Sequence, residues 1–367
     1  MKILFRWLIL VVALCVMQAN PAAADSSRLS TQEAQAPQTP AQASQTQPQA
    51  SQEQDSQTPA QAAPDSPYTL EIDPTLVSVD VLVTDEDGRV LGGLKQGNFR
   101  IFDEGNAREI SKFDPTNTPI TIVMLMEYSS SSYNYFANKA AVWGAGFLNH
   151  LEPQDWVALV TYDIKSKVQA DFTHNLAQVR DTLTHLGFPG FRDANVYDAV
   201  IETLENLEKV HGRKAILLLS TGTNSFSSSS LDDVLNQLQR SDATIFTVGL
   251  AEEEYVRYGG ADITYAQSRS FLNTVAERSG GMAFFPRFQG ALPDVFRTVS
   301  TFLRNEYTLS FSPPKASRDG KYHRLRVEVV GQDGKPLKVT DAKGRLRKIK
   351  VYARAGYTAR KEKALAE

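Results

Sequence analysis

The side chains that most often perform catalysis are present in this chain, but their spacing matches no catalytic motif. The sequence contains no glycine-rich nucleotide-binding loop, no zinc-protease motif and no nucleophile elbow. Its five histidines are scattered, and none is spaced like a pair of metal ligands. Nothing in the pattern supplies the base that a serine nucleophile would need. We therefore expect that the protein is not an enzyme, and we assign no catalytic residues.

Two polar loops carry side chains that suit recognition of a partner. Residues 251–266 follow a strand-like run and combine acidic with aromatic side chains, a composition typical of binding loops. Residues 222–230 add a second candidate loop with a run of serines. The candidate partner-binding residues are Glu252, Glu253, Tyr255, Tyr258 and Asn224. For both loops the alternative is a solvated insertion without function, and the serine run favours that alternative.

The elements that must position these loops alternate between strands and helices. Continuous apolar runs at 120–126, 156–162, 215–220 and 244–250 are typical of strands buried on both faces. Helical patterns lie between and after these runs, at 133–151, 176–186, 196–210, 231–240, 268–279 and 292–304. This alternation predicts an α/β domain over residues 118–304, with a doubly wound, mainly parallel, Rossmann-like sheet.

Strand patterns also flank this domain on both sides. Before it they lie at 77–84, 98–103 and 108–113, and after it at 307–311, 322–330 and 346–353. Two separate β pieces would leave exposed strand edges, which folded proteins avoid. We therefore predict that residues 68–117 and 305–358 together form one small β-sandwich.

The first 67 residues are expected to lie outside the folded part. Residues 1–24 have a positive start, a short apolar run and small residues before a cleavage point at Ala24, which is typical of a signal peptide; an uncleaved anchor is the alternative. Residues 25–67 are rich in Gln, Ala, Ser and Pro and are predicted to be a disordered linker. We expect an exported protein, periplasmic, outer-surface or secreted, with no transmembrane span after signal cleavage. It would have no disulfides, because its one cysteine is Cys15.

The charge of the chain is nearly balanced overall but uneven along its length. There are 39 Lys+Arg against 42 Asp+Glu, which argues against a nucleic-acid-binding protein. Residues 315–367, which include a basic tail at 359–367, hold 16 lysines and arginines against 6 acidic residues. Contact with an anionic envelope polymer or an acidic protein is one interpretation. A charged outer strand face is the more ordinary one.

Several segments resemble a known family in the same order along the chain. Residues 122–131 resemble the first strand and loop of a von Willebrand factor A domain, whose loop normally reads D-x-S-x-S. Residues 194–199 resemble the second loop, and residues 215–222 resemble the strand leading into the third. The flanks resemble one subgroup, the von Willebrand factor A-related proteins common in Acidobacteria, through motifs at 79–85, 306–313 and 354–357. The resemblance implies a von Willebrand factor A-like domain at 118–304.

The resemblance also implies a metal-ion-dependent adhesion site, in which two serines, a threonine and two aspartates hold a magnesium ion. Of those five positions, this chain keeps only Ser129 and Ser131. Glu127 replaces the first aspartate, Ala194 the threonine and Thr221 the second aspartate. Coordination by neutral oxygens alone scarcely compensates magnesium for the water ligands that it loses on binding. The comparison therefore implies a degenerate site with no cofactor, in which Ser129, Ser131 and Thr221 hydrogen-bond one another and nearby backbone.

Two functions remain open on the sequence alone. The first is an exported, non-catalytic protein-interaction or adhesion module that binds a protein or an envelope polymer without metal. The second is a divalent-cation-dependent adhesion or assembly protein that binds an acidic partner. It would hold Mg²⁺ or Mn²⁺ through Glu127, Ser129, Ser131 and a substitute carboxylate from Asp193, which lies beside Ala194.

Overall fold

The computed structural model describes residues 76–114, 118–130, 140–250, 263–341 and 343–359. All of them belong to one unit of the chain that spans residues 62–367. None of the helices in these described ranges is long and apolar enough to cross a membrane.

The central sheet has six strands in the order β10-β9-β8-β5-β6-β7. Their bounds are β5 Ile120–Glu127, β6 Trp156–Tyr162, β7 Ser166–Thr173, β8 Arg213–Ser220, β9 Thr244–Gly249 and β10 Ala283–Phe284. All neighbours pair in parallel except β6 and β7, which are antiparallel. Every residue of β5, β8 and β9 is buried, as expected for apolar runs covered on both faces. The predicted mainly parallel sheet is confirmed.

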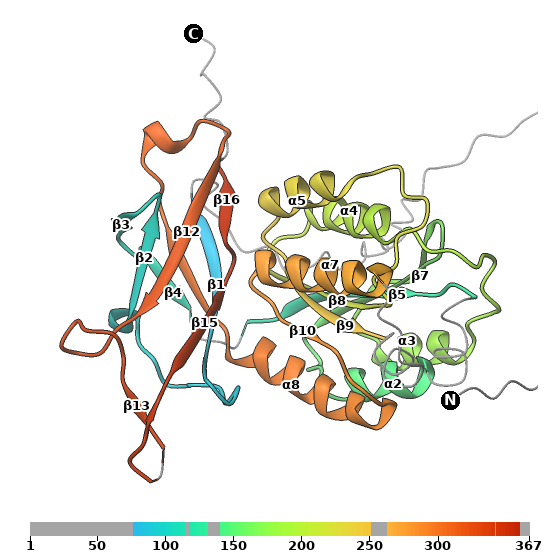
Figure 1. Cartoon of the computed structure of the whole chain (residues 1–367), viewed down its shortest axis with the longest axis horizontal. Coiled ribbons are helices and arrows are strands. Elements are labelled where there is room, and N and C mark those ends of the chain that lie inside the picture. Colours follow the sequence, from blue (N-terminus) through green and yellow to red (C-terminus); the bar gives the residue numbers. More distant parts are fainter. Residues whose placement is uncertain (1–75, 115–117, 131–139, 251–262, 342, 360–367) are drawn as a thin grey trace, which may run out of the picture. The chain divides into compact units, whose positions relative to one another are not determined.

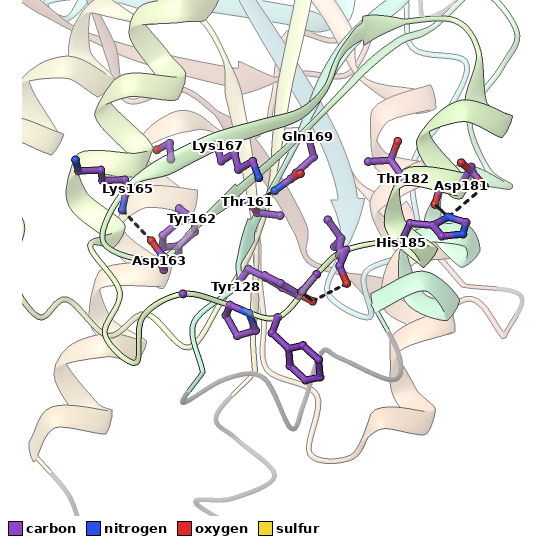
Figure 2. Close-up of a pocket in the computed structure, with 16 residues that line it drawn as sticks. Tyr128, Thr161, Tyr162, Asp163, Lys165, Lys167, Gln169, Asp181, Thr182 and His185 are labelled. Atoms are coloured by element: carbon purple, nitrogen blue, oxygen red, sulfur yellow. Dashed lines mark hydrogen bonds and ion pairs between the residues drawn. The ribbon is translucent and has the colours of Figure 1, made fainter. Parts of the chain in front are cut away.

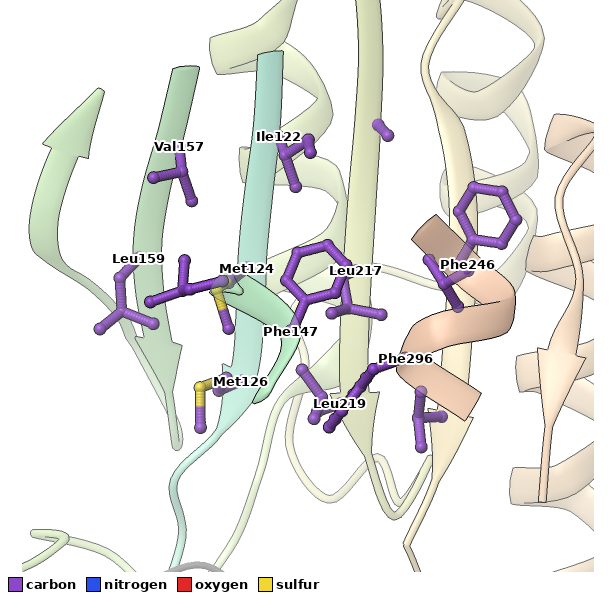
Figure 3. Close-up of a cluster of buried hydrophobic side chains, with 14 of the residues drawn as sticks. Ile122, Met124, Met126, Phe147, Val157, Leu159, Leu217, Leu219, Phe246 and Phe296 are labelled. Carbon is purple, nitrogen blue, oxygen red and sulfur yellow. The ribbon is translucent and has the colours of Figure 1, made fainter. Parts of the chain in front are cut away.

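Helices cover both faces of this sheet (Figure 1). One face is covered by α2 (Ala140–Leu148), α3 (Leu176–Thr184) and α8 (Leu292–Asn305), and the other by α4 (Val196–Leu207), α5 (Leu231–Arg240) and α7 (Ile263–Ser279). On the first face, Phe147 and Phe296 pack over Met124 and Leu217 of the central strands (Figure 3). The burial of each such side chain stabilises the fold by about 1.5–3 kcal/mol, and this packing holds the strand ends in place.

The flanking strands form two further antiparallel sheets. Their orders are β15-β1-β11-β4 and β16-β12-β2-β3. Their bounds are β1 Val77–Asp85, β2 Phe99–Asp103, β3 Asn106–Arg108, β4 Lys112–Asp114, β11 Tyr307–Phe311, β12 Tyr322–Val329, β15 Ile349–Ala353 and β16 Gly356–Thr358. Strand β1 pairs with β11 and β15, and β2 pairs with β12, so both ends of the chain build each sheet. Apolar side chains of the two sheets share one core, and the predicted sandwich of flanking strands is confirmed.

Some predicted element bounds were wrong, because pairing partners decide where a strand ends. The run 108–113 is two strands: β3 pairs with β2 in one sheet, and β4 pairs with β11 in the other. The run 346–353 is divided at Lys348, because β14 (Leu346–Arg347) pairs with β13 (Val339–Thr340) whereas β15 pairs with β1. Helix α7 begins at Ile263, so residues 263–266 are helix rather than loop.

A buried ion pair joins the central sheet to the sandwich. Arg213, at the start of β8, lies 2.5 Å from Glu306 and 3.9 Å from Asp80 of β1. Burial raises the pKa of Glu306 to about 7, although Arg213 opposes the shift. At the same end of the sheet, Arg304 pairs with the fully buried Asp155. The cluster therefore holds three carboxylates and two guanidinium groups.

Candidate functional site

The candidate site lies where β5 and β8 end side by side. Residues pair in register along the two strands as far as Met126 and Leu219. Glu127 is the last residue of β5, and Ser220 is the last residue of β8. Both side chains are buried. The carboxyl ends of neighbouring parallel strands are where open α/β sheets bind ligands.

The carboxylate of Glu127 accepts hydrogen bonds on both oxygens. Oε2 accepts from the Ser220 hydroxyl at 3.0 Å, from the Thr221 backbone N–H at 2.7 Å and from the Thr221 hydroxyl at 2.8 Å. Oε1 accepts from the Ser129 hydroxyl at 3.2 Å. The hydroxyls of Ser129 and Thr221 thus both donate to Glu127, because its side chain is long enough to reach across to the end of β8.

Ser220 and Tyr162 extend this network, and the sequence analysis missed both. The Tyr162 hydroxyl donates to Ser220 Oγ at 2.7 Å, and the Gly222 N–H donates to the same oxygen at 2.8 Å. Both residues end apolar strands, at the positions matching Glu127 in the sheet. The pattern that could have identified both residues in the sequence is a polar residue at the carboxyl end of a buried strand.

Burial and hydrogen bonding have opposite effects on the pKa of the Glu127 carboxyl. Loss of water raises the pKa of its carboxyl above the usual value, while the donors Thr221, Ser220 and Ser129 lower it. Burial, together with the nearby Glu127 charge, also raises the pKa of Tyr162. Removing either oxygen's donors would leave a buried acceptor unsatisfied, which is costly.

The second loop places an exposed and a buried residue next to each other. Asp193 is exposed to solvent, whereas Glu127 is buried. Ala194, in the place of the family's threonine, is buried, and its backbone oxygen accepts a hydrogen bond from the Ser225 N–H at 2.9 Å. The role of Asp193 as a substitute carboxylate stays a prediction.

The loop with the serine run is tied to helix α4. Asp198, in the first turn of α4, accepts backbone N–H groups from Ser228 and Ser229 at 2.8 and 2.9 Å. Burial tends to raise the pKa of Asp198, but these serine donors outweigh it and lower the pKa. Asn224 is held in the same way, because its Oδ1 accepts the Ser227 hydroxyl at 2.5 Å. The loop is thus a built part of the site's rim rather than a loose insertion.

Three exposed phenylalanines lie on the loops around this edge of the sheet. Phe188 is 85% exposed and Phe191 is 52% exposed, on the loop that precedes α4. Phe226 is 72% exposed, on the loop after β8. The backbone of Phe191 accepts the Ser130 N–H at 2.8 Å, which ties its loop to the first loop of the site. Large apolar side chains left in water near one another are typical of interaction surfaces.

A cavity of about 710 Å³ opens beside the same edge. It lies between β7 and α3, with Tyr128 and Phe188 among its lining (Figure 2). The Tyr128 hydroxyl donates to the Gly187 carbonyl at 2.6 Å and so fixes the loop that borders the cavity. On the strand side, Gln169 donates to Thr161 at 2.7 Å. The sequence analysis did not predict this cavity, since its walls come from separate segments.

Five of the predicted site residues cannot be placed. Ser131, Glu252, Glu253, Tyr255 and Tyr258 lie outside the described residues. Within the part of the chain that is described, no group of three or more His, Cys, Asp or Glu side chains could hold a metal ion. Both oxygens of Glu127 already accept hydrogen bonds from protein donors, whereas magnesium requires hard oxygen ligands that can coordinate it.

The open, mainly parallel sheet with helices on both faces defines an α/β domain of the Rossmann-like class. Residues 121–298 match the family model of the von Willebrand factor type A domain. This part of the chain is therefore a von Willebrand factor type A domain, and the resemblance of its strand and loop motifs is confirmed at that level.

Solved structures similar to this chain include three bacterial proteins. The conserved hypothetical protein BatB from Bacteroides thetaiotaomicron is 15% identical over 50% of this chain and 98% of its own, with a TM-score of 0.38. The vWF domain of the type V pili tip protein Mfa5 from Porphyromonas gingivalis is 14% identical over 51% and 95%, with a TM-score of 0.40. The PilB minor pilin from Streptococcus sanguinis is 12% identical over 52% and 62%, with a TM-score of 0.39. No curated protein matches the chain significantly, so the functional proposal rests on the site.

Proposed function

We propose that this chain is an exported, non-catalytic protein-interaction or adhesion module that binds its partner without a metal ion. The observation that carries the proposal is the hydrogen bonding of Glu127. A carboxylate that serves a cation keeps an oxygen free for it, whereas Glu127 receives four donors from Ser129, Ser220 and Thr221. The acidic residue of the adhesion site has become an internal brace between β5 and β8.

The binding surface in this proposal is the loop edge around the brace. Phe191 and Phe226 are exposed there, on loops whose backbones are hydrogen-bonded to the rest of the site. A preformed apolar surface loses little entropy on binding and gains from the water it releases. We infer that a protein partner covers these rings, and that Glu127 keeps the loops in place for it.

We also propose that the protein belongs to one subgroup of its family, that it is exported and that it is not an enzyme. The flanking motifs support membership of the Acidobacteria-type group of von Willebrand factor A-related proteins, and the N-terminal pattern supports export. The absence of a catalytic motif in the sequence supports a non-catalytic role. The alternative is a divalent-cation-dependent module, which would need Glu127 to release its donors and coordinate an ion.

Partner capture from an extract of the host's envelope tests the proposal. The bound proteins are compared between wild type and the variant F191S/F226S, each with EDTA and with magnesium. We expect the same bound proteins in EDTA and in magnesium, and their loss from the variant. The matched control is Val168→Ser, which removes a 57% exposed apolar side chain from strand β7 rather than from these loops and should leave capture unchanged. Release of the partner by EDTA would support the cation-dependent alternative instead.

A further inference from the structure

The segment that follows β12, residues 331–350, is strongly basic and contains a hairpin. Residues 331–350 contain seven lysines and arginines against two aspartates, although the whole chain has a net charge of −3. Within it, β13 and β14 form a two-stranded ribbon (Figure 1). A local excess of positive charge on a chain of negative overall charge can attract an anionic surface.

The arginines and the lysines of this hairpin have different environments. Arg345 and Arg347 both contact Asp341, at 2.8 and 3.1 Å, and Arg347 also lies 3.2 Å from Glu86. The arginines therefore engage Asp341 of the hairpin and Glu86 of the neighbouring turn, while Asp333 accepts the backbone N–H of Lys335. By contrast, among the described residues no ion pair joins a carboxylate to any of the five lysine ammonium groups. These belong to Lys335, Lys338, Lys343 and Lys348, and to Lys350, which donates to the backbone oxygen of Glu86 at 3.5 Å.

Strand alternation places two of these lysines on one face with an exposed leucine. Thr340 pairs with Leu346, and both are exposed, whereas Val339 and Arg347 on the other face are partly buried. Lys338 directly precedes and Lys348 directly follows these pairs, and both are exposed. Leu346, next but one to Lys348, is 65% exposed. Like charges gathered on one exposed face repel one another, and an anionic partner would relieve that repulsion.

We propose that the face formed by Lys338, Leu346 and Lys348, with Lys335 and Lys343 at its edge, docks onto an anionic phospholipid surface. A lysine ammonium is a flexible point charge and does not grip one anion through two parallel hydrogen bonds, as an arginine can. Several exposed lysines therefore suit a surface with many dispersed negative charges rather than one specific anion. Each lysine near an anionic bilayer strengthens binding roughly fivefold. An exposed leucine among the lysines suits the boundary between headgroups and acyl chains, which a soluble polymer does not offer. This surface is separate from the loop edge proposed above for the protein partner.

Sedimentation with vesicles tests the proposal on the full-length chain. The vesicles are phosphatidylcholine alone or phosphatidylcholine with roughly 30% phosphatidylglycerol, at about 50 mM and about 500 mM salt. We expect wild type to bind the anionic vesicles at least tenfold more tightly than the neutral ones at low salt, and to lose that preference at high salt. Binding to neutral vesicles reports the contribution of the apolar N-terminal segment, which all variants share.

Variants locate the binding face. K338E/K348E is expected to weaken binding to anionic vesicles at least tenfold, and Leu346→Ser severalfold, with unchanged thermal unfolding. The matched control is K165E/K167E, which changes the net charge equally at two exposed lysines beside the cavity and should bind like wild type. Equal binding by K338E/K348E, or equal loss in K165E/K167E, would overturn the proposal. Binding of inorganic polyphosphate through Lys338 and Lys348 without any binding to vesicles would also overturn it, in favour of a soluble polyanion.

Discussion

At the scale of single residues, Glu127 determines the chemistry of the site. A buried carboxylate must be compensated by a cation or by hydrogen-bond donors, because burial of an uncompensated charge is very unfavourable. Here the compensation comes from three side chains and one backbone N–H group. One extra methylene relative to aspartate lets the carboxylate reach the end of β8. This reach supports the proposal that Glu127 is a structural rather than a metal-binding group.

Removing this carboxylate should destabilise the fold. Glu127→Ala would leave the buried hydroxyls of Ser129 and Ser220 without their acceptor and would open a cavity, so we expect a loss of about 2–4 kcal/mol in the free energy of unfolding. Urea unfolding measures this loss. Asp193→Ala is the control: its side chain is exposed, and we expect a change within about 0.5 kcal/mol. Similar losses in both variants would show that Glu127 is not a brace.

The second residue-scale prediction concerns Glu306 and pH. Its pKa in the folded state is about 7, above the ordinary value of 4.5, because Glu306 is buried and lies near the charge of Asp80, although Arg213 opposes the shift. The stability that protonated Glu306 contributes is fully present below pH 4.5 and is lost as the pH rises through 7. The loss is about 3 kcal/mol.

The variant Glu306→Gln cannot ionise and should lack this part of the pH dependence. Unfolding free energies of wild type and variant, measured from about pH 4.5 to pH 8, should shift in favour of the variant as the pH rises. A difference that stays constant, or that shifts the other way, would contradict the assigned pKa.

At the scale of elements, the sequence predicted the strands of the central sheet well, since runs such as 120–126 and 215–220 can only be buried strands. It could not predict which donors Glu127 would find. That depends on β5 and β8 being neighbours in register, a tertiary fact that no local pattern contains. For the same reason it missed Tyr162 of β6 and joined β3 to β4, which belong to different sheets.

Gly222 shows how closely helix α7 packs on the third loop. Its φ is +78°, and a Cβ there would lie 2.7 Å from the Ser268 carbonyl oxygen of α7. Gly222→Ala should therefore cost about 3 kcal/mol, from backbone strain and from the clash. Gly212→Ala is the matched control, because its φ is +87° but no atom lies within 4 Å. We expect about 1 kcal/mol there, measured by urea unfolding. Equal losses would mean that the loop and α7 separate easily.

At the scale of the whole molecule, the von Willebrand factor type A domain is inserted, along the sequence, between the two sets of strands that pair to form one sandwich. β1 and β2 obtain their partner strands from residues more than two hundred positions later in the chain. The sequence predicted this closure from the cost of open edges alone. It could not predict the Arg213–Glu306 pair, because strand β8 and the start of β11 meet only in the folded chain.

Truncation tests this dependence. A chain ending at Asn305 would lack β11, β12, β15 and β16, so we expect apolar surface to be exposed around β1, with dye binding and no single cooperative transition. A chain lacking only residues 360–367 is the control and should unfold like wild type. If the shorter chain kept β1 protected from hydrogen exchange, the sandwich would not need both ends.

The central claim, that the adhesion site has become a brace that does not bind a cation, is tested most directly by calorimetry. Wild type and the variant E127D/A194T/T221D, which restores the family's residues, are titrated with Mg²⁺ and Mn²⁺ up to millimolar concentration. We predict no saturable heat from wild type and a saturable heat from the variant, since it gains a second carboxylate at 221 and a hydroxyl at 194 and has the shorter aspartate at 127. Saturable binding by the wild-type protein would contradict the claim.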